Sequence, residues 1–327
     1  MIKKIRTTNR EEWLAERKKS LGGSDMGAVL GMSPYASPLS VWMDKTGKTP
    51  DKEPSEWMRL GTDLEDYVAQ RFSEKSGLKV INDTATWRND KYPHLHANID
   101  RKVVGQKSGV ECKMISTLNE KKYRDGSFPD NYYVQCVHYL AVSEYDRWYL
   151  AVLIYGFGLR IYLMTRIEND VKPEWCDSMV YVEDGEVEAL ANTGEDFWQK
   201  YVATNTTPPV DGHSATSDAL NALYPQSDDT SCDLSGYSSD LMLYVTTQKE
   251  IKRLEEQKDA IANRIKGYMT TSSRGKTDSF SVSWTTSERS TFDSKSFAKD
   301  HQDMDLSSYY KTTTIRTFKI TEKKENK

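Results

Sequence analysis

The sequence predicts an α/β (α+β) fold in which a central mixed sheet is flanked by helices. Residues 56–77 place apolar side chains at helical spacing, whereas residues 78–116 alternate polar and apolar side chains with a period of two. Helical spacing returns at residues 129–142, and two β-rich runs follow. The resulting order over residues 1–205 is helix, sheet, helix, sheet, which is typical of proteins whose helices and sheet share one core.

Three helices are expected before the first strand of this sheet. Residues 9–20 and 37–47 each fit a short helix, and residues 56–77 fit a long one that ends at Gly77. Glycine suits this end because it adopts the left-handed conformation that commonly follows a helix. The long helix has a repeating apolar face made of Leu60, Leu64, Tyr67, Val68 and Phe72.

The strands are expected in two groups. Residues 78–87, 94–104 and 109–116 predict three strands in succession. Residues 148–156 and 159–167 are rich in β-branched and aromatic residues, and a Gly-Phe-Gly turn separates them. This second group therefore predicts a hairpin.

The chain is expected to divide after this core. A helix at residues 184–201 is followed by residues 204–220, which are rich in Pro, Thr and Ser and mark a boundary. We predict a core at residues 1–212, an acidic and polar linker at residues 213–239, and a C-terminal extension at residues 240–327.

The extension is expected to be an accessory module. Apolar spacing predicts a long helix over residues 240–268. Residues 279–286 and 312–320 have the composition of strands, and we expect them to pair.

Composition excludes several classes of protein. The four cysteines lie far apart and form no CxxC pair, which argues against a zinc or iron–sulfur site built from cysteine. The N-terminus has no apolar signal-peptide core, and no run approaches the roughly 20 apolar residues of a membrane span. We therefore expect a cytoplasmic protein with no membrane partner.

Charge is distributed unevenly along the chain. Residues 168–240 carry 16 acidic and 2 basic side chains, whereas residues 251–327 carry 16 basic and 11 acidic ones. This asymmetry is compatible with nucleic-acid binding but only weakly indicative of it.

The central chemical signal lies in the segment ANIDRKVVGQKSGVECKM, residues 97–114. Side chains two apart on a strand share a face, so Glu111 and Lys113 point the same way. A turn between the two strands would bring Asp100 beside Glu111. The plain alternative is an exposed hairpin face, because Glu and Lys two apart on a strand are common.

Two carboxylates at short range repel, and burying them together is costly unless a cation lies between them. Mg²⁺ (or Mn²⁺) resolves this conflict, because such an ion binds one or two carboxylates together with water and phosphate oxygens. Lys113 would orient or deprotonate an attacking water, or stabilise developing negative charge. The set suits hydrolysis of a phosphodiester.

Further candidates lie on the predicted helices. Glu65 is flanked by apolar helix positions and is a candidate third carboxylate, the alternative being a solvated helix acid. Gln135 and Tyr139, four apart, share one helix face and would contact a phosphate and the site lysine. The alternative for this pair is a core helix with a polar fringe.

The glycine-rich stretch LGGSDMGAVLGMSPY, residues 21–35, is neither a P-loop nor a dinucleotide fingerprint, because it lacks both GK[ST] and GxGxxG. Ser24 or Asp25 is expected to cap the helix that follows. Free N–H groups at a helix start attract anions, and Arg17 lies just upstream. The stretch therefore predicts a phosphate contact, with the Asp25 carboxylate turned away from the phosphate.

The ordered set of these motifs resembles the lambda-exonuclease-like, YqaJ-type viral recombinases, which have a PD-(D/E)xK nuclease fold. The resemblance covers residues 9–212. Its motifs are, in order, GGSDMGAVLGMSPYASPLSVWMDKTG, GTDLE, ANIDRKV, GVECKM, YYVQCVHYLAV, WYLAVLIYG, FWQKYV and TPPVDG. The tail, with FDSKSFAKDH and TTTIRTFKI, is similar to the extension of many phage members.

The resemblance implies a role for each candidate residue. Glu65, Asp100 and Glu111 resemble the metal-binding carboxylates, and Lys113 resembles the catalytic lysine. Gln135 and Tyr139 match the family's QxxxY motif. Arg17 and Ser24 resemble the pair that holds a DNA 5′-phosphate. The chain departs from the family where Ala97-Asn98-Ile99 replaces the usual proline and small residue before the first acid, and Asn98 is kept as a candidate phosphate contact.

The implied activity is that of a Mg²⁺-dependent 5′→3′ exonuclease that digests linear duplex DNA and leaves 3′ single strands for recombination. The resemblance also implies a homo-oligomer, a trimeric ring, and a single-strand annealing protein as partner. Two alternatives stay open: an endonuclease or repair nuclease of the same fold, and a non-catalytic protein that binds DNA ends for assembly.

Overall fold

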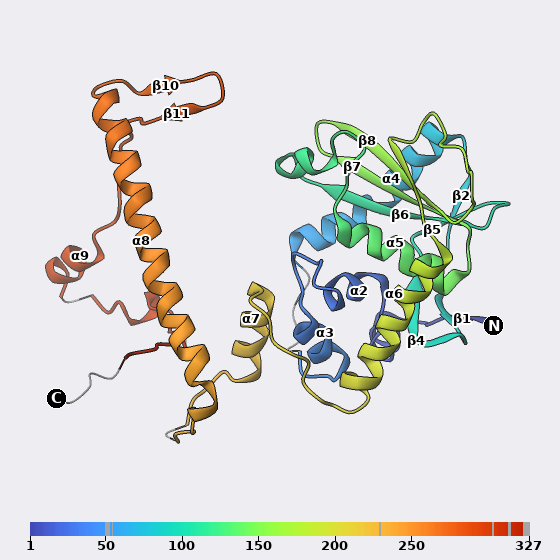
Figure 1. The fold of residues 1–327 in the computed structure, drawn as a ribbon, viewed down its shortest axis with the longest axis horizontal. Coiled ribbons are helices and arrows are strands. Elements are labelled where there is room, and N and C mark those ends of the chain that lie inside the picture. Colours follow the sequence, from blue (N-terminus) through green and yellow to red (C-terminus); the bar gives the residue numbers. More distant parts are fainter. Residues whose placement is uncertain (50–52, 54, 229, 303, 313–314, 323–327) are drawn as a thin grey trace. The chain divides into compact units, whose positions relative to one another are not determined.

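The computed structural model describes residues 1–49, 53, 55–228, 230–302, 304–312 and 315–322 (Figure 1). Two compact units make up the chain, Met1–Tyr224 and Pro225–Lys327. The first unit holds both of the hydrophobic core clusters found among the described residues.

The first unit contains seven α-helices and nine strands in its described part. The helical elements are α1 (Arg10–Arg17), α2 (Gly23–Val29), α3 (Pro38–Lys45), α4 (Glu56–Ser76), η1 (Thr117–Tyr123), α5 (Asp130–Ser143), α6 (Asp184–Phe197), the π-helical turn η2 (Trp198–Val202) and α7 (Ser214–Leu223). The strands are β1 (Ile2–Ile5), β2 (Val80–Asn82), β3 (Thr86–Asn89), β4 (Tyr92–Asn98), β5 (Arg101–Val103), β6 (Ser108–Ile115), β7 (Arg147–Ile154), β8 (Gly158–Thr165) and β9 (Ser178–Tyr181).

The main sheet has six strands in the order β2-β5-β6-β7-β8-β9. The pairs β6–β7 and β8–β9 are parallel, whereas β2–β5, β5–β6 and β7–β8 are antiparallel. A second, three-stranded sheet has the order β1-β3-β4. The predicted class, a mixed sheet flanked by helices and followed by a long C-terminal helix, is therefore confirmed, and so is the hairpin of β7 and β8.

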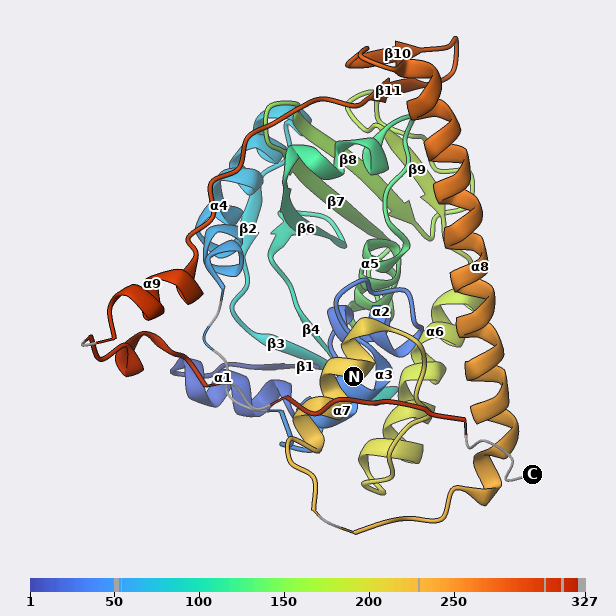
Figure 2. The ribbon, with the colours of Figure 1, turned by 90° about the vertical axis from the view of Figure 1, so that its left-hand side faces the viewer.

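The two faces of the main sheet are covered by different helices, as Figure 2 shows for α4 and α5. Val68 and Phe72 of α4 pack in one core with Val110 and Cys112 of β6. The other core contains α5 residues together with Leu150 of β7. Because side chains alternate along a strand, Glu111 of β6 points toward the face that α5 covers.

Helix α4 is well fixed only at its C-terminal half. Its buried residues are Val68, Ala69 and Phe72, while Leu60 and Tyr67 of the predicted apolar face are 41% and 47% exposed. The helix ends as predicted at Gly77, whose φ of 73° is left-handed. The first half of α4 therefore has little apolar packing to hold it.

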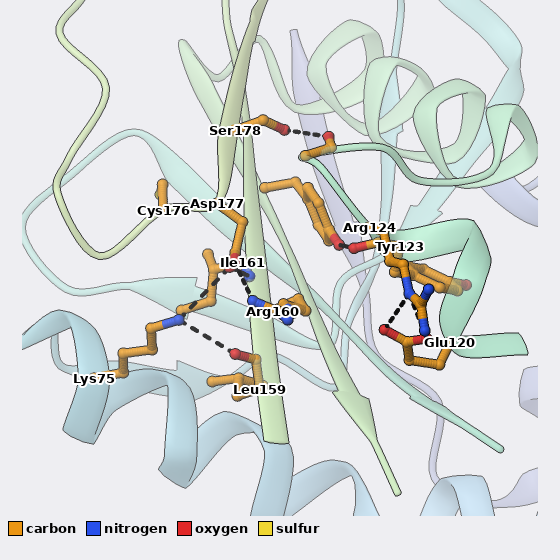
Figure 3. A network of polar contacts seen from close by, with 12 residues as sticks. Lys75, Glu120, Tyr123, Arg124, Leu159, Arg160, Ile161, Cys176, Asp177 and Ser178 are labelled. Carbon is orange, nitrogen blue, oxygen red and sulfur yellow. Dashed lines mark hydrogen bonds and ion pairs between the residues drawn. The ribbon is translucent and has the colours of Figure 1, made fainter. Parts of the chain in front are cut away.

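A polar network centred on Asp177 fixes the C-terminal end of α4 to the sheet (Figure 3). Asp177 accepts a hydrogen bond from the backbone N–H of Ile161 at 2.8 Å and pairs with Arg160 at 2.9 Å. Lys75 of α4 lies 3.6 Å from the same carboxylate and donates to the Leu159 carbonyl at 3.2 Å. This end of the helix is thereby tied to β8.

Several details differ from the sequence-based expectation in the first unit. The predicted strand at residues 78–87 is divided into β2 and β3, and the predicted strand at residues 94–104 is divided between β4 and β5; in each case the two parts belong to different sheets. The segment predicted as a linker, residues 213–239, begins with helix α7, whose residues Thr216 and Ala219 are buried. Helix α2 is capped by Gly22 and not by Ser24 or Asp25, because Asp25 at the third helical position accepts the Gly22 N–H at 2.8 Å. The Asp25 carboxylate also pairs with the buried Lys45 at 2.7 Å, so it is turned into the protein, as expected.

The second unit contains the predicted long helix, α8 (Ser238–Met269). Its hairpin joins β10 (Arg274–Lys276) to β11 (Ser281–Ser283). Residues 312 and 315–320 of the predicted partner segment are not part of a strand, so the predicted pairing was wrong for these residues, and residues 313–314 lie outside the described part. The tight turn after β10 supplies a nearer partner, so the pairing is local. The remaining elements are η3 (Ser235–Tyr237), α9 (Ser294–Asp300) and η4 (Ser307–Tyr309).

No helix in the described ranges of either unit has the length and apolarity needed to cross a bilayer.

Candidate active site

The turn between β5 and β6 brings Asp100 next to Glu111. The two strands pair antiparallel with Arg101 opposite Val110, so Asp100, one residue before β5, continues the register toward Glu111. The Asp100 Oδ2 atom accepts the backbone N–H of Cys112 at 2.8 Å. The geometry thus agrees with the expectation from the sequence that these two carboxylates lie side by side.

Glu111 lies at the centre of a buried polar cluster and is 1% exposed. Its Oε1 atom accepts hydrogen bonds from Lys113 and from the Gln135 amide, the latter at 2.7 Å. Gln135 also donates to the Tyr139 hydroxyl at 2.9 Å. The Oε2 atom of Glu111 is buried and has no hydrogen-bond partner in the part of the chain that the structure describes. A buried carboxylate oxygen without a partner is costly unless a bound cation or water satisfies it.

The close approach of α2 to α5 shapes this cluster. A Cβ atom at Gly23 would lie 2.9 Å from the Gln135 Cγ atom and 3.0 Å from the Tyr139 ring. Glycine at this position lets the start of α2 press directly on the two side chains. The glycine-rich stretch therefore contributes to the site through packing.

The charges of the cluster shift its pKa values. Burial, and then the neighbouring Glu111 carboxylate, raise the pKa of Asp100 to about 8. Burial acts to lower the pKa of Lys113, but the Glu111 and Asp100 carboxylates outweigh it, so this pKa is raised above its ordinary value. Lys113 therefore keeps its proton, and one carboxyl of the pair tends to hold one too.

Glu65 lies at the edge of this pair but is bound to a different cation. The Arg101 Nη1 atom donates to Glu65 Oε1 at 2.5 Å, and Nη2 donates to Asp66. Burial, and then Asp100, raise the pKa of Glu65, so its carboxyl feels the charge of the pair. Among the described residues, no group of three or more His, Cys, Asp or Glu side chains is arranged to hold a metal ion.

A cleft of about 1120 Å³ opens onto the cluster. Its lining includes Arg17, Glu65, Asp100 and Lys113. A smaller pocket of about 420 Å³ shares Glu65 and Asp100 with this cleft and is also lined by Asn98. Glu65 and Asp100 therefore border both hollows, whereas Glu111 belongs to the lining of neither.

The candidate phosphate contacts Arg17, Ser24 and Asn98 lie at different distances along the chain and in different surroundings: one lines the large cleft, one the smaller pocket, and one neither. Arg17 lies in the cleft with its guanidinium 4.7 Å from the Trp13 ring centre. Ser24 is exposed in the first turn of α2 and does not belong to the lining of the cleft. Asn98 faces the smaller pocket and accepts a hydrogen bond from Thr86 at 2.8 Å. Only Arg17 of this group therefore shares the large cleft with the carboxylates.

Arg101 is the residue of the site that sequence reasoning missed. Its side chain is 5% exposed and contacts the Asp100 carbonyl as well as Glu65. The alternation of side chains along β5 could have indicated that Arg101 is buried, because it shares a strand face with the buried Val103. A buried arginine requires a partner. The neighbouring Asp100 contributes its backbone carbonyl to Arg101, so the acidic partner had to come from elsewhere in the chain.

The fold and the site define a mixed α/β protein with a paired-carboxylate and lysine centre on its main sheet. Comparison with known families matches residues 12–146 to the YqaJ-like viral recombinase domain. A curated relative, Uncharacterized protein YqaJ from Bacillus subtilis (strain 168), is 32% identical over 319 residues, which are 96% of this chain and 95% of the relative. The chain belongs to the YqaJ-like viral recombinase family.

Two solved structures are also similar in part. The alkaline exonuclease LHK-Exo from Laribacter hongkongensis matches 60% of this chain and 94% of its own, at 18% identity and a TM-score of 0.46. A phage-related exonuclease from Haemophilus somnus 129PT matches 57% of this chain and 94% of its own, at 11% identity and a TM-score of 0.40.

Proposed function

We propose that the protein is a metal-dependent deoxyribonuclease that digests linear duplex DNA from the 5′ end and leaves 3′ single strands for recombination by annealing. The observation that carries this proposal is the buried pair Asp100 and Glu111 with Lys113 beside it, of which Asp100 and Lys113 line a cleft. Membership of a viral recombinase family supports a role in DNA recombination.

The residues present fit a divalent cation. The Oε2 atom of Glu111 has no hydrogen-bond partner among the described residues, and burial, followed by the neighbouring Glu111 carboxylate, raises the pKa of Asp100. A bound cation would satisfy the first and offset the second. Asp100 and Glu111 would hold Mg²⁺ or Mn²⁺, with Glu65 as third carboxylate and the DNA phosphate completing the shell. Such an ion lowers the pKa of a bound water and stabilises charge on the scissile phosphate.

Lys113 acts as a fixed positive charge in this scheme. Its raised pKa keeps it protonated, which disfavours the role of proton acceptor that the sequence left open. The Lys113 side chain, 26% exposed, lines the cleft, and its hydrogen bond to Glu111 holds it in place. It therefore orients the attacking water and offsets the negative charge that develops on the phosphate.

The remaining side chains divide into orienting and binding roles. Gln135 orients Glu111 through its amide, and Tyr139 holds Gln135, so both act through the carboxylate. Arg17 lines the cleft and would bind a terminal phosphate of the DNA as a bidentate donor. Ser24 and Asn98 are proposed as weaker phosphate contacts, in the first turn of α2 and at the smaller pocket.

The family resemblance also supports proposals about assembly. We propose a cytoplasmic homo-oligomer, a trimeric ring around the DNA, which works with a single-strand annealing protein. Analytical ultracentrifugation of the full chain tests the ring, since a monomer at working concentration would contradict it.

The activity is tested with four substrates and three conditions. Linear duplexes with and without a 5′-phosphate, a closed circle and a nicked circle are incubated with Mg²⁺, with Mn²⁺ or with EDTA. The proposal expects mononucleotides from linear DNA, more from the phosphorylated end, and none in EDTA. Cutting of closed circles would favour an endonuclease or repair nuclease. Binding of ends without cleavage in either Mg²⁺ or Mn²⁺ would favour the non-catalytic assembly protein.

A further inference from the structure

Arg101 joins the helix that carries Glu65 to the strand that follows Asp100. It is the first residue of β5 and is 4% exposed. Its Nη1 atom donates to the Asp100 carbonyl at 2.6 Å and to Glu65 Oε1 at 2.5 Å. One guanidinium nitrogen therefore fixes the distance between the α4 carboxylate and the backbone of the site.

This connection is needed because little else holds the first half of α4. The buried residues of α4 begin at Val68, and the Asp177 network fixes only its other end. Residues before Glu65 on α4 are exposed or half-buried. Without the guanidinium, the Glu65 carboxylate would be free to swing away from Asp100.

The contact with Arg101 engages one oxygen of the Glu65 carboxylate and leaves the other oxygen able to bind a ligand. The ion pair engages Oε1 of Glu65, and no bond to Oε2 is found in the described part of the chain. The side chain is 31% exposed and lines both hollows together with Asp100. The guanidinium is itself locked by the Asp100 carbonyl, so it is not placed to leave.

We propose that Arg101 is a positioning residue that holds Glu65 beside the Asp100–Glu111 pair so that its second oxygen completes the divalent-metal site. This inference rests on the proposed nuclease function and adds a residue to it. Partners that orient a metal-binding carboxylate typically contribute 10- to 100-fold, as an order of magnitude, to metal affinity.

The test measures metal binding in the absence of DNA. Mn²⁺ is titrated calorimetrically into the full-length chain and its variants, and circular dichroism establishes that each variant is folded. Arg101→Gln is expected to weaken Mn²⁺ binding by about 10- to 100-fold. In cleavage assays the same variant should need correspondingly more Mn²⁺, with the rate at saturating metal changing less than the midpoint. A purely structural role would not shift the metal midpoint of a folded variant.

Two further variants show whether Arg101 acts through Glu65. Glu65→Gln should weaken Mn²⁺ binding, and Glu65→Gln with Arg101→Gln should be no weaker than Glu65→Gln alone, because a residue that acts through another is non-additive with it. Asp66→Asn is the matched control. It removes the other acid that Arg101 contacts, but Asp66 is 92% exposed, so Mn²⁺ affinity should change by less than about fivefold.

The outcomes separate this inference from the proposed function. A wild-type chain that binds no Mn²⁺ and cleaves no DNA overturns both. A wild-type chain that binds and cleaves, with unchanged or tighter binding in Arg101→Gln, overturns the inference alone. Tighter binding would in addition make Arg101 a competitor of the metal. If Arg101→Gln does not fold, Arg101→Lys decides. A single ammonium cannot hold Glu65, Asp66 and the Asp100 carbonyl together, so wild-type affinity in that variant overturns the proposal.

Discussion

At the scale of single residues, Lys113 separates metal binding from chemistry. Its ammonium contacts Glu111 and faces the cleft, but it is not placed to ligate a cation. We expect Lys113→Ala to lower the cleavage rate by at least about 100-fold, because it removes a charge aimed at the reacting phosphate. Mn²⁺ affinity and binding of DNA ends in EDTA should persist. Single-turnover cleavage and a gel-shift assay measure the two effects.

The control for this variant is Lys107→Ala in the turn before β6. The Lys107 side chain is exposed, so its loss should leave the cleavage rate close to that of the wild type. A Lys113→Ala chain with normal cleavage would remove Lys113 from the site. An equal loss in both variants would mean that general charge, and not position, matters.

At the scale of elements, α5 couples the site to a buried histidine. His138, which lies on α5 directly before Tyr139, is wholly buried, and its Nε2 atom lies 2.7 Å from the His96 carbonyl. Burial lowers the pKa of His138 to about 4. The folded chain therefore holds this ring neutral at pH 5, where the unfolded chain would protonate it.

The sign of the resulting pH dependence follows from the two pKa values. Above pH 6.5 neither state takes up the proton, and the contribution of His138 to stability is complete. Between pH 6.5 and about 4 only the unfolded chain binds it, so the free energy of unfolding falls as the pH falls, by about 3 kcal/mol in total. Urea unfolding at several pH values measures this slope.

His138→Gln should flatten the slope, because an amide at this position does not titrate. His301→Gln, at an exposed histidine, is the control and should leave the slope as in the wild type. An unchanged slope in His138→Gln would assign the acid sensitivity to other groups, His96 first, because burial also lowers the pKa of that ring well below its ordinary value.

At the scale of the whole molecule, the first unit should fold without the second. Both hydrophobic clusters lie within residues 1–224, and in the described part of the second unit only Val245 and Met269 are buried apolar side chains. We expect a chain of residues 1–224 to unfold in one cooperative transition and to bind Mn²⁺ as the full chain does. Thermal unfolding and calorimetry test this. A broad, non-cooperative transition would mean that the second unit contributes to the core of the first.

The sequence by itself determined most of the long helices and the pairing of charge on the strands. Alternation placed Glu111 and Lys113 on one face, and the short turn before β6 brought Asp100 to the same place, because strand geometry is local and its period is fixed. Helical spacing likewise predicted α4 and its end at Gly77. These features depend on residues close together in the chain, so a pattern in the sequence is enough to reveal them.

Tertiary structure alone decided how distant segments share the site. Arg101 pairs with Glu65, 36 residues earlier, and Gln135 donates to Glu111 across 24 residues. Neither bond has a local pattern, because each depends on which helix covers which face of the sheet. The exposed first half of α4 has the same cause. Packing between layers determines which polar groups are buried, and a buried polar group takes whichever partner the neighbouring layer supplies.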